Sequence, residues 1–447
     1  MKKINMNTKT FLITFIFIFF CSINYGQKEL SAKQAVFKSL ENNYQILISK
    51  KQLNISEKNN KWSEAGLFPT VELNSTQSNT IQDNTNNPFT FTPGIILSQS
   101  INPSLNLNWN IFSGFRVKMS KKQLEQLKEQ SANNVIAVIE NTIQDVLKAY
   151  YTVQLQKYRK NLFKDIMAIS RKRYEYNKSK EIYSGSNSLE SMQFRNQYLT
   201  DSTNYLMQNI SYNNSMRNLI LLMNDTSETN FILTDDIDIA VKNVDFIDAE
   251  QQMFENNQNL KNQYISLELQ KTETNLKRSF LYPTISFQAG VNPRWSNIRD
   301  VKNSNLDLST QTLSYYGNFN LRYTLFNNWK NKRAIEISKI QEQIVELNIE
   351  NIKKSLSNTL KNLIDIYSVR TQLVAISQEN VTYAEIAYKL AEDRYNLGTI
   401  NSIDLANFQT NYQNTMIQHY ENLFNRMDTY LEIYKMSGKI GLSYKDN

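Results

Sequence analysis

The chain has 447 residues, of which only 10 are Gly and 6 are Pro, and this scarcity of helix breakers excludes a compact α/β enzyme with many short loops. A single His and a single Cys argue against catalytic triads, His-ligated metal sites and disulfides, so we expect neither an enzyme nor a cofactor. The formal charge of +8 comes from 50 basic and 42 acidic residues, a mixed surface that does not indicate a nucleic-acid partner, and the mean hydropathy of −0.52 excludes a multi-helix membrane protein.

Residues 1–26 are typical of a secretory signal peptide. Three lysines precede a ten-residue, mostly apolar run, which is too short to span a bilayer because a spanning helix needs about 20 residues. We place the cleavage site near Gly26, so that the mature chain starts at Gln27. Lipid attachment to Cys21 is an alternative, although Phe20 stands where a lipidation signal has a small residue.

The next segment, 27–223, begins with a predicted helix and a β-hairpin. Apolar and polar residues alternate over 105–111, and more weakly over 71–81, which predicts two strands of a hairpin at about 69–112. The stretch 82–94 is rich in Asn and other small polar residues, so we expect it to connect the two strands.

The helices of this segment are unusual in length. Neither Gly nor Pro interrupts 115–184, and apolar residues recur there at steps of three and four, as in a coiled coil. A helix of that length would measure roughly 100 Å, so we predict an extended coiled coil rather than a globular domain. Shorter helices at 31–66 and 188–223 are expected to pack against it.

A linker at 224–246 leads into a second segment, 247–436, which has the same order of elements around a hairpin at about 283–326, and a tail at 437–447 follows. In chain order, the elements expected there are a helix at 247–281, a strand at 285–291, a loop at 295–312, a strand at 313–325, a long helix from near Trp329 to Leu397 and a helix at 402–436.

The two segments are an internal duplication. At a constant offset of 214 positions, Glu-Asn-Asn at 41–43 matches 255–257, and Leu-Phe-Pro-Thr at 67–70 matches Leu-Tyr-Pro-Thr at 281–284. Phe112 matches Phe326 at the same offset. One offset that holds over more than 70 residues predicts two copies of one structural repeat.

Amphipathic aromatic residues cluster where the hairpins meet the long helices, a pattern that favours a membrane–water interface. The candidate interface anchors are Trp109, Phe112, Phe115, Phe326 and Trp329. Basic residues such as Arg116 and Lys330 follow directly and could reach anionic lipid headgroups, so outer-membrane lipids are expected partners. The alternative is the edge of a soluble β-sandwich followed by charged residues at helix starts. It fits less well, because the positive end of the helix dipole disfavours basic residues at a helix N-terminus.

Four transmembrane strands cannot close a barrel, because an open sheet edge is not tolerated in lipid. If the strands span a membrane, several chains must share one barrel, with eight strands from two copies or twelve from three. These considerations alone do not choose between the two numbers.

Two segments carry a resemblance to a known family. The strand-to-helix junction Leu-Asn-Trp-Asn-Ile-Phe-Ser-Gly at 107–114, and Arg-Tyr-Asn-Leu-Gly at 394–398 followed by Ser-Ile-Asp-Leu at 402–405, resemble the TolC-like outer membrane efflux proteins, or outer membrane factors. The resemblance covers nearly all of residues 28–436. It implies a mainly α protomer with β-hairpins, internally duplicated, in a homotrimer with an α-helical barrel and a shared twelve-stranded outer-membrane β-barrel.

The same resemblance implies a location in the outer membrane, with the helical part in the periplasm and an equatorial belt formed by 224–246 and the tail. It also implies two partners: a periplasmic adaptor (membrane fusion) protein that docks at the helical tip, and an inner-membrane pump reached through that adaptor. The second tip would begin at Arg394 and Tyr395 and turn at Gly398, and the first would run from Arg173 through a turn at Gly185.

Asp404 and Glu190 match the family's acidic residues near the tip gate, where a ring of like charges selects cations. The simpler interpretation, compatible with the first, is that both carboxylates stabilise helix N-termini. Likewise, Gly185 and Gly398 could be ordinary turn glycines at helix ends. Asn407 stands where some members carry a second acid, so a doubled acidic constriction is not expected. The first tip is five residues longer than the second, so its docking geometry cannot be copied from the family.

We therefore expect an outer-membrane exit duct of a tripartite efflux or type I secretion system, a passive channel without catalytic residues. Drug efflux, metal efflux and protein secretion are all compatible with it. The alternative is a periplasmic coiled-coil scaffold or adhesion protein without a pore.

Overall fold

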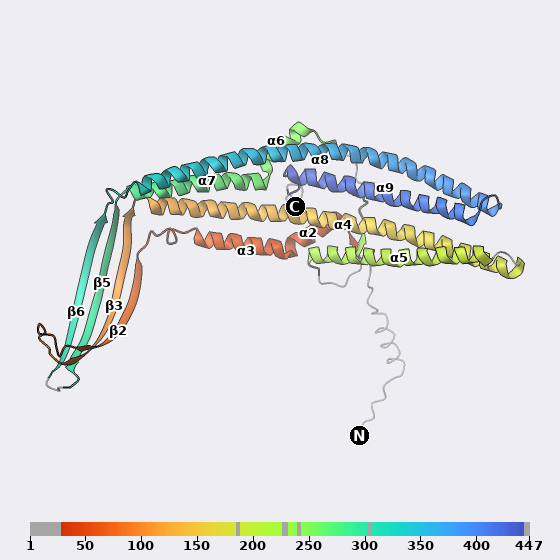
Figure 1. Cartoon of the computed structure of the whole chain (residues 1–447). Helices are drawn as coiled ribbons and strands as arrows, with labels where there is room; N and C mark the ends of the chain where they lie inside the picture. The colour runs from red at the N-terminus through yellow and green to blue at the C-terminus, as the bar shows by residue number, and fades with distance from the viewer. Residues whose placement is uncertain (1–27, 185–187, 226–230, 239–242, 303–305, 442–447) are drawn as a thin grey trace, which may run out of the picture. The chain divides into compact units, whose positions relative to one another are not determined.

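The computed structural model describes residues 28–184, 188–225, 231–238, 243–302 and 306–441, so the expected signal peptide and Gly185 lie outside the described residues. Figure 1 labels the elements. In chain order they are β1 (Lys28–Leu30), α2 (Ala32–Asn42), α3 (Tyr44–Asn59), β2 (Thr70–Asp83), β3 (Ile95–Ser113), α4 (Arg116–Ser184), α5 (Ser188–Met223), β4 (Phe231–Leu233), α6 (Phe246–Asn256), α7 (Gln258–Arg278), η1 (Ser279–Leu281), β5 (Thr284–Asp300), β6 (Asp307–Arg322), α8 (Lys330–Asn396) and α9 (Ser402–Met436).

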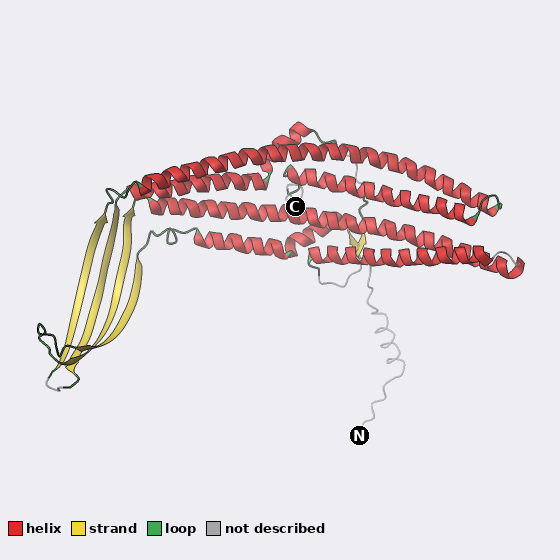
Figure 2. Ribbon diagram, viewed as in Figure 1, coloured by secondary structure: helices red, strands yellow, loops and turns green. Residues whose placement is uncertain are grey.

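The prediction of a mainly helical chain with two β-hairpins is confirmed, as Figure 2 shows. Long helices α4 and α8 occupy the two stretches that lack Gly and Pro. Among the described residues, no helix combines the length and apolar character needed to cross a bilayer. The chain divides into two compact units, and α4 and α8 contribute residues to both.

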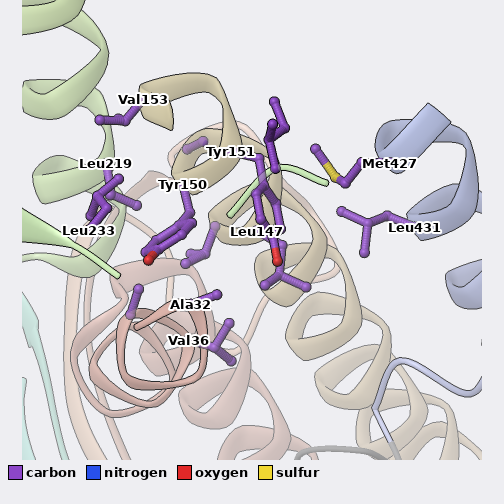
Figure 3. Packing of buried hydrophobic residues seen from close by; sticks show 14 of the residues in the cluster. Ala32, Val36, Leu147, Tyr150, Tyr151, Val153, Leu219, Leu233, Met427 and Leu431 are labelled. Atoms are coloured by element: carbon purple, nitrogen blue, oxygen red, sulfur yellow. The ribbon is translucent and has the colours of Figure 1, made fainter. Parts of the chain in front are cut away.

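Unit 1 consists of the described parts of Met1–Leu47, Val138–Asn256 and Asn358–Asn447. Its core packs Leu147, Tyr150 and Tyr151 of α4 against α2, α5, β4 and α9, as Figure 3 shows. The fully buried Tyr150 hydroxyl donates to the carbonyl of Leu30 at 2.8 Å and accepts from the amide of Thr234 at 3.1 Å. This one hydroxyl therefore fixes the short parallel pair β1–β4, which the sequence analysis did not predict.

Unit 2 consists of Ile48–Ala137 and Asn257–Ser357 and carries the antiparallel sheet, in the order β2-β3-β5-β6. Here polar contacts join the helices. The Thr272 hydroxyl of α7 donates to Gln126 of α4 at 2.9 Å, and the Thr274 hydroxyl lies 2.8 Å from that of Ser338 on α8. Because each of these buried groups has a partner, the helices can pack closely without an apolar seam at this level.

The helices predicted at 31–66 and 247–281 are not continuous, which corrects the expectation. Asn43 separates α2 from α3, and its counterpart in the duplication, Asn257, separates α6 from α7. The side-chain oxygen of Asn43 accepts from the amide of Gln45 at 2.8 Å, and that of Asn257 accepts from Leu260 at 3.1 Å. Each Asn thus caps a new helix, and the break is preserved in both repeats.

The loop between β5 and β6 is shorter than the predicted 295–312, because β5 continues to Asp300 and β6 begins at Asp307. The outer parts of these strands pair Asn297 with Ser309 and Ser296 with Thr310. Both faces of the sheet are polar at this level, so no alternation of apolar and polar residues marks the strands there. The boundaries of the two repeats, the linker and the tail stay a prediction.

Candidate channel and gate site

The four-stranded sheet has one apolar face. Its register aligns Leu73, Leu105, Val291 and Tyr315 in one row across the four strands, and aligns Trp109, Phe287 and Phe319 in another. The Phe287 and Phe319 rings lie 4.7 Å apart between centroids. Most of these side chains are exposed, with Leu73 at 77% and Tyr315 at 71%, while Phe287 and Val291 are half-buried. A broad exposed apolar face of this kind marks a surface that something apolar covers.

The opposite face of the same sheet is polar. The Tyr316 hydroxyl crosses β5 and donates to the Asn106 side chain on β3 at 2.9 Å. It passes over Gly290, where an added Cβ would lie 2.7 Å from the Tyr316 ring and 2.7 Å from the Leu105 carbonyl oxygen. Gly290 therefore gives the ring its place on the polar face. Other residues of this face are Asn74, Asn108, Gln288, Asn318 and Asn320.

The junctions between the sheet and the long helices share an uncommon backbone conformation. Gly114 and Phe115 have φ values of 63° and 65°, and at the offset of the duplication Asn328 and Trp329 have 54° and 59°. A bulky residue at positive φ is strained, and strain of this kind persists only where the surrounding structure fixes it. The same left-handed turn thus directs the chain from strand to helix in both repeats.

All five candidate anchors lie at this helix-proximal end of the sheet or in its junctions. The Phe115 ring makes edge-on contacts with Phe112 and Tyr282, with centroids 5.4 Å and 5.6 Å apart, and the Phe326 and Trp329 centroids are 6.0 Å apart. The indole NH of Trp109 donates to the Leu67 carbonyl at 2.9 Å. Their role as membrane anchors stays a prediction.

Cations accompany these aromatic rings. The Arg116 guanidinium lies 4.4 Å from the Phe280 ring centroid, and the Lys332 ammonium lies 5.5 Å from that of Trp329. Ring faces stabilise these charges at the starts of α4 and α8, where the helix dipole does not.

In unit 1, the far ends of the helices carry the candidate gate. The Tyr395 hydroxyl on α8 donates to the Glu190 carboxylate on α5 at 2.7 Å, and Phe194 of α5 makes an edge-on contact with the Tyr395 ring at 5.7 Å. Burial raises the pKa of Tyr395 above its ordinary value, and the hydrogen bond to the Glu190 carboxylate raises it further. The hydroxyl therefore stays protonated and keeps its role as donor.

Arg173 on α4 contacts both α8 and α9. The Arg173 side chain is only 13% exposed, and its guanidinium lies 2.9 Å from the Glu392 carboxylate and donates to the Tyr388 hydroxyl at 2.5 Å, both on α8. It also donates to the side-chain oxygen Oε1 of Gln409 on α9 at 2.5 Å. One planar side chain of α4 with several donors thus holds both α8 and α9.

Gln409 extends this arrangement into the interior. It is 3% exposed, and its amide nitrogen lies 3.4 Å from a carboxylate oxygen of Asp201, which is itself 2% exposed. Asp201 also accepts from the Ser170 hydroxyl, and from the Gln197 amide at 3.0 Å. The buried carboxylate is therefore hydrogen-bonded by groups from α4, α5 and α9, which limits the cost of burying it.

The remaining tip residues have simpler surroundings. Gly398 has a φ of +73° and ends α8 in a left-handed turn, and Arg394 is exposed in the last turn of that helix. Asp404 is exposed in the first turn of α9, whose N-cap is Asn401. The structure therefore joins Glu190, Tyr395 and Arg173 directly to the opposing helices, whereas Asp404 keeps the position of a helix-start acid. The gate and docking roles stay predictions.

Sequence reasoning missed Glu392, Gln409 and Asp201, since their partners stand 31 to 236 positions away along the chain. The acidic residues at 235–238 have structural partners: Asp235 accepts from the Ala32 amide at 2.9 Å, and Asp238 from the Arg426 guanidinium at 2.5 Å. Within the part of the chain that the structure describes, no group of three His, Cys, Asp or Glu side chains is placed to hold a metal ion.

The chain resembles solved outer-membrane channels in fold. It matches the CmeC channel of Campylobacter jejuni with a TM-score of 0.72 at 14% identity, over 91% of this chain and 85% of that one. It matches the open state of the MtrE channel of Neisseria gonorrhoeae with a TM-score of 0.71 at 15% identity, over 91% and 88%. A membrane protein from Pseudomonas aeruginosa gives a TM-score of 0.74 at 12% identity, over 94% and 95%.

No curated protein sequence matches the chain. A family model described as outer membrane efflux protein matches residues 36–224 and 250–439, which takes in most of both repeats. With the duplicated helices and hairpins, this match confirms the resemblance to TolC-like proteins: the chain belongs to the outer membrane efflux protein family.

Proposed function

We propose that the chain is a passive exit duct, which carries substrates of an inner-membrane pump across the outer membrane as a homotrimer. As an outer membrane efflux protein it resides in the outer membrane, with its helical part in the periplasm. The observation that carries the proposal is the sheet, which has one apolar face, one polar face and two free edges.

The apolar face has the height that a bilayer requires. On β5 it runs without a polar side chain from Ile285 to Trp295, ten residue steps or roughly 34 Å, which gives roughly 26 Å along the membrane normal for strands tilted by about 40°. The apolar band of outer-membrane proteins is about 25 Å tall. The polar face, with its amides and Tyr316, then faces water inside the pore.

The free edges support an assembly of several chains. β2 and β6 lie at the two ends of the sheet, and their outward backbone groups would be unsatisfied in lipid. Pairing of β6 in one copy with β2 in the next satisfies them and closes a barrel. Three copies give twelve strands, which leaves room for a lumen, whereas eight strands leave an interior filled with side chains.

The contacts at the far ends of the helices support a gate. If the gate opens by separation of α8 and α9 from α4 and α5, the Tyr395–Glu190 hydrogen bond and the Arg173–Glu392 ion pair must be lost. An adaptor that binds the hairpin turns, near Gly398, could supply the free energy for this change. Energy for transport comes from the pump, because the duct itself contributes no chemical step.

Reconstitution in planar bilayers tests the proposal, together with the native mass of the detergent-extracted protein. We expect a trimer mass and stepwise conductance that increases when the gate contacts are removed. A monomeric mass, or membranes that stay silent with correctly folded protein, would contradict the duct and favour the scaffold without a pore.

A further inference from the structure

A hollow of about 510 Å³ lies on the sheet near its outer end, among side chains that the channel function does not use. Its lining comes from all four strands: Gln77, Gln99, Ser100, Ile101, Trp295, Ser296, Asn297, Ser309, Thr310 and Gln311. Volumes of this size are typical of small-molecule sites. Because it lies within the sheet of one chain, it does not depend on how copies assemble.

The lining residues place the hollow on the apolar face. Gln77, Ile101, Trp295 and Gln311 form one row across the sheet, and Gln99, Asn297 and Ser309 belong to the next row of the same face. A hollow on the polar face would be walled by Asn102, Arg294 or Thr312, which do not line it. Ser100, Ser296 and Thr310, between the two rows, therefore contribute its floor.

The chemistry of the face changes at this level. Nearer the helices the same face carries Leu73, Leu105, Val291 and Tyr315 in one row. Here carboxamides join the apolar Ile101 and Trp295, and the next row outward holds Asn79, Gln99, Asn297 and Ser309. Trp295 is the last aromatic residue of the face and is 43% exposed. On a sheet that spans the membrane, this is the depth at which acyl chains give way to headgroups.

The hollow thus combines an aromatic surface with groups that both donate and accept hydrogen bonds. Gln99 donates to Asn79 at 3.2 Å, and Asn297 donates to Asp307 at 2.6 Å, so two of the carboxamides are oriented while their carbonyl oxygens can still accept. Arg299 is exposed one row farther out on the same face. Amides suit sugar hydroxyls, the indole suits the apolar side of a sugar ring, and a guanidinium suits a phosphate.

We propose that this hollow binds the phosphorylated sugar headgroup of a glycolipid in the outer leaflet. The inference rests on the proposed membrane-spanning sheet, because only that orientation brings the hollow to the outer headgroup layer. Binding there would fix the depth and rotation of the sheet in the membrane, since Trp295 and the amides on both sides of it are engaged at once.

The test uses delipidated, full-length protein in detergent, titrated with lipid A, a phosphorylated glucosamine disaccharide lipid, and followed by native mass spectrometry. The test variants are Gln99→Leu/Gln311→Leu and Trp295→Leu, which keep the face apolar. Gln288→Leu, on the polar face of β5, is the matched control. We expect the test variants to lose about tenfold or more in apparent affinity, while the control stays within about twofold of the wild type.

Phosphatidylglycerol in a parallel titration separates sugar recognition from attraction of any anionic lipid. If it binds as tightly as lipid A, or if both test variants bind lipid A as the control does, the inference is wrong. Conductance of the wild type in bilayers free of glycolipid checks the duct separately: conducting trimers that ignore lipid A overturn only the headgroup site. A protein that neither inserts nor trimerises overturns both.

Discussion

The hydroxyl of Tyr395 on α8 donates a 2.7 Å hydrogen bond to the carboxylate of Glu190 on α5, so the helix pair α8 and α9 is joined to the pair α4 and α5. Tyr395→Phe removes this donor and leaves the ring contact with Phe194. Hydrogen bonds to charged groups contribute about 1.5–3 kcal/mol to stability. We therefore expect the population of open channels in the variant to be about tenfold or more above that of the wild type. Single-channel recording of the reconstituted protein measures this change.

Tyr176→Phe is the matched control, because Tyr176 on α4 is 67% exposed near the same end of the helices. It should behave as the wild type. Equal conductance of the two variants, in trimers of normal mass, would show that the hydrogen bond does not hold the gate.

Arg173 should be more sensitive than its charge alone suggests. Arg173→Lys keeps an ammonium that can reach Glu392 but loses the fork that also reaches Tyr388 and Gln409. We therefore expect a conductance between those of the wild type and Arg173→Ala. Arg171, which is largely exposed and pairs with Glu175 on its own helix, provides the control Arg171→Ala. An Arg173→Lys channel equal to the wild type would contradict a role for the fork.

Asp404 should influence ion selectivity rather than gating. Its carboxylate is exposed at the start of α9, and three copies around an axis would make a ring of negative charge. Asp404→Asn should lower the preference for cations, measured as the reversal potential under a salt gradient. Asp393→Asn, at an exposed acid of α8, is the control. A reversal potential that shifts equally in both variants would remove Asp404 from the constriction.

The turn at Gly114 should tolerate no side chain. An added Cβ would lie 2.2 Å from the Ser279 carbonyl oxygen, at a φ of +63°. Gly66 has a φ of +86° with nothing within 4 Å of its Cβ position, so Gly66→Ala carries only the backbone strain. We expect Gly114→Ala to lower the midpoint of thermal unfolding in detergent clearly more than Gly66→Ala. Equal midpoints would mean that the junction has room to adjust.

His419 should make stability depend on pH. It is 7% exposed, its Nδ1 lies 3.0 Å from the Ser377 hydroxyl, and burial lowers its pKa below the ordinary 6.5. Arg426 lowers the pKa further, and Asp238 opposes the shift. Below about pH 6.5 the unfolded chain binds a proton that the folded chain does not, so stability falls as the pH falls.

His419→Gln removes this titration and keeps a polar side chain. The difference in unfolding midpoint between roughly pH 7.5 and 5.5 should therefore be smaller in the variant than in the wild type. If both proteins lose the same amount, other groups account for the acid sensitivity.

Much of the fold could be predicted because it depends on local patterns. Long helices follow from stretches without Gly or Pro, and the inner parts of the strands follow from alternation. The outer strand segments could not be predicted, because the paired residues there, such as Asn297 with Ser309 and Ser296 with Thr310, are polar on both faces of the sheet. The helix breaks at Asn43 and Asn257 could not be predicted either. An Asn can be identified as a helix cap only when its side-chain oxygen is seen to accept from a backbone amide of the following turn.

Some residues of the candidate gate could be predicted from the sequence, but their partners could not. Arg173, Glu190 and Tyr395 came from the resemblance, but their contacts depend on how helices far apart in the chain face one another. Nothing in the local sequence marks Gln409 as the partner of Arg173, 236 positions away, or Asp201 as a buried acid with several donors. Spacing can identify a residue type at a tip, whereas pairing needs the packed structure.

The free edges of β2 and β6 have a consequence for biogenesis. An unpaired strand edge is a template for indiscriminate pairing, so a newly exported chain is at risk of aggregation until a neighbour covers it. Assembly and insertion should then be coupled events rather than successive ones. The yield of functional protein should depend on how fast copies meet. Slow export, or too few periplasmic chaperones, would then let chains aggregate before they reach the membrane.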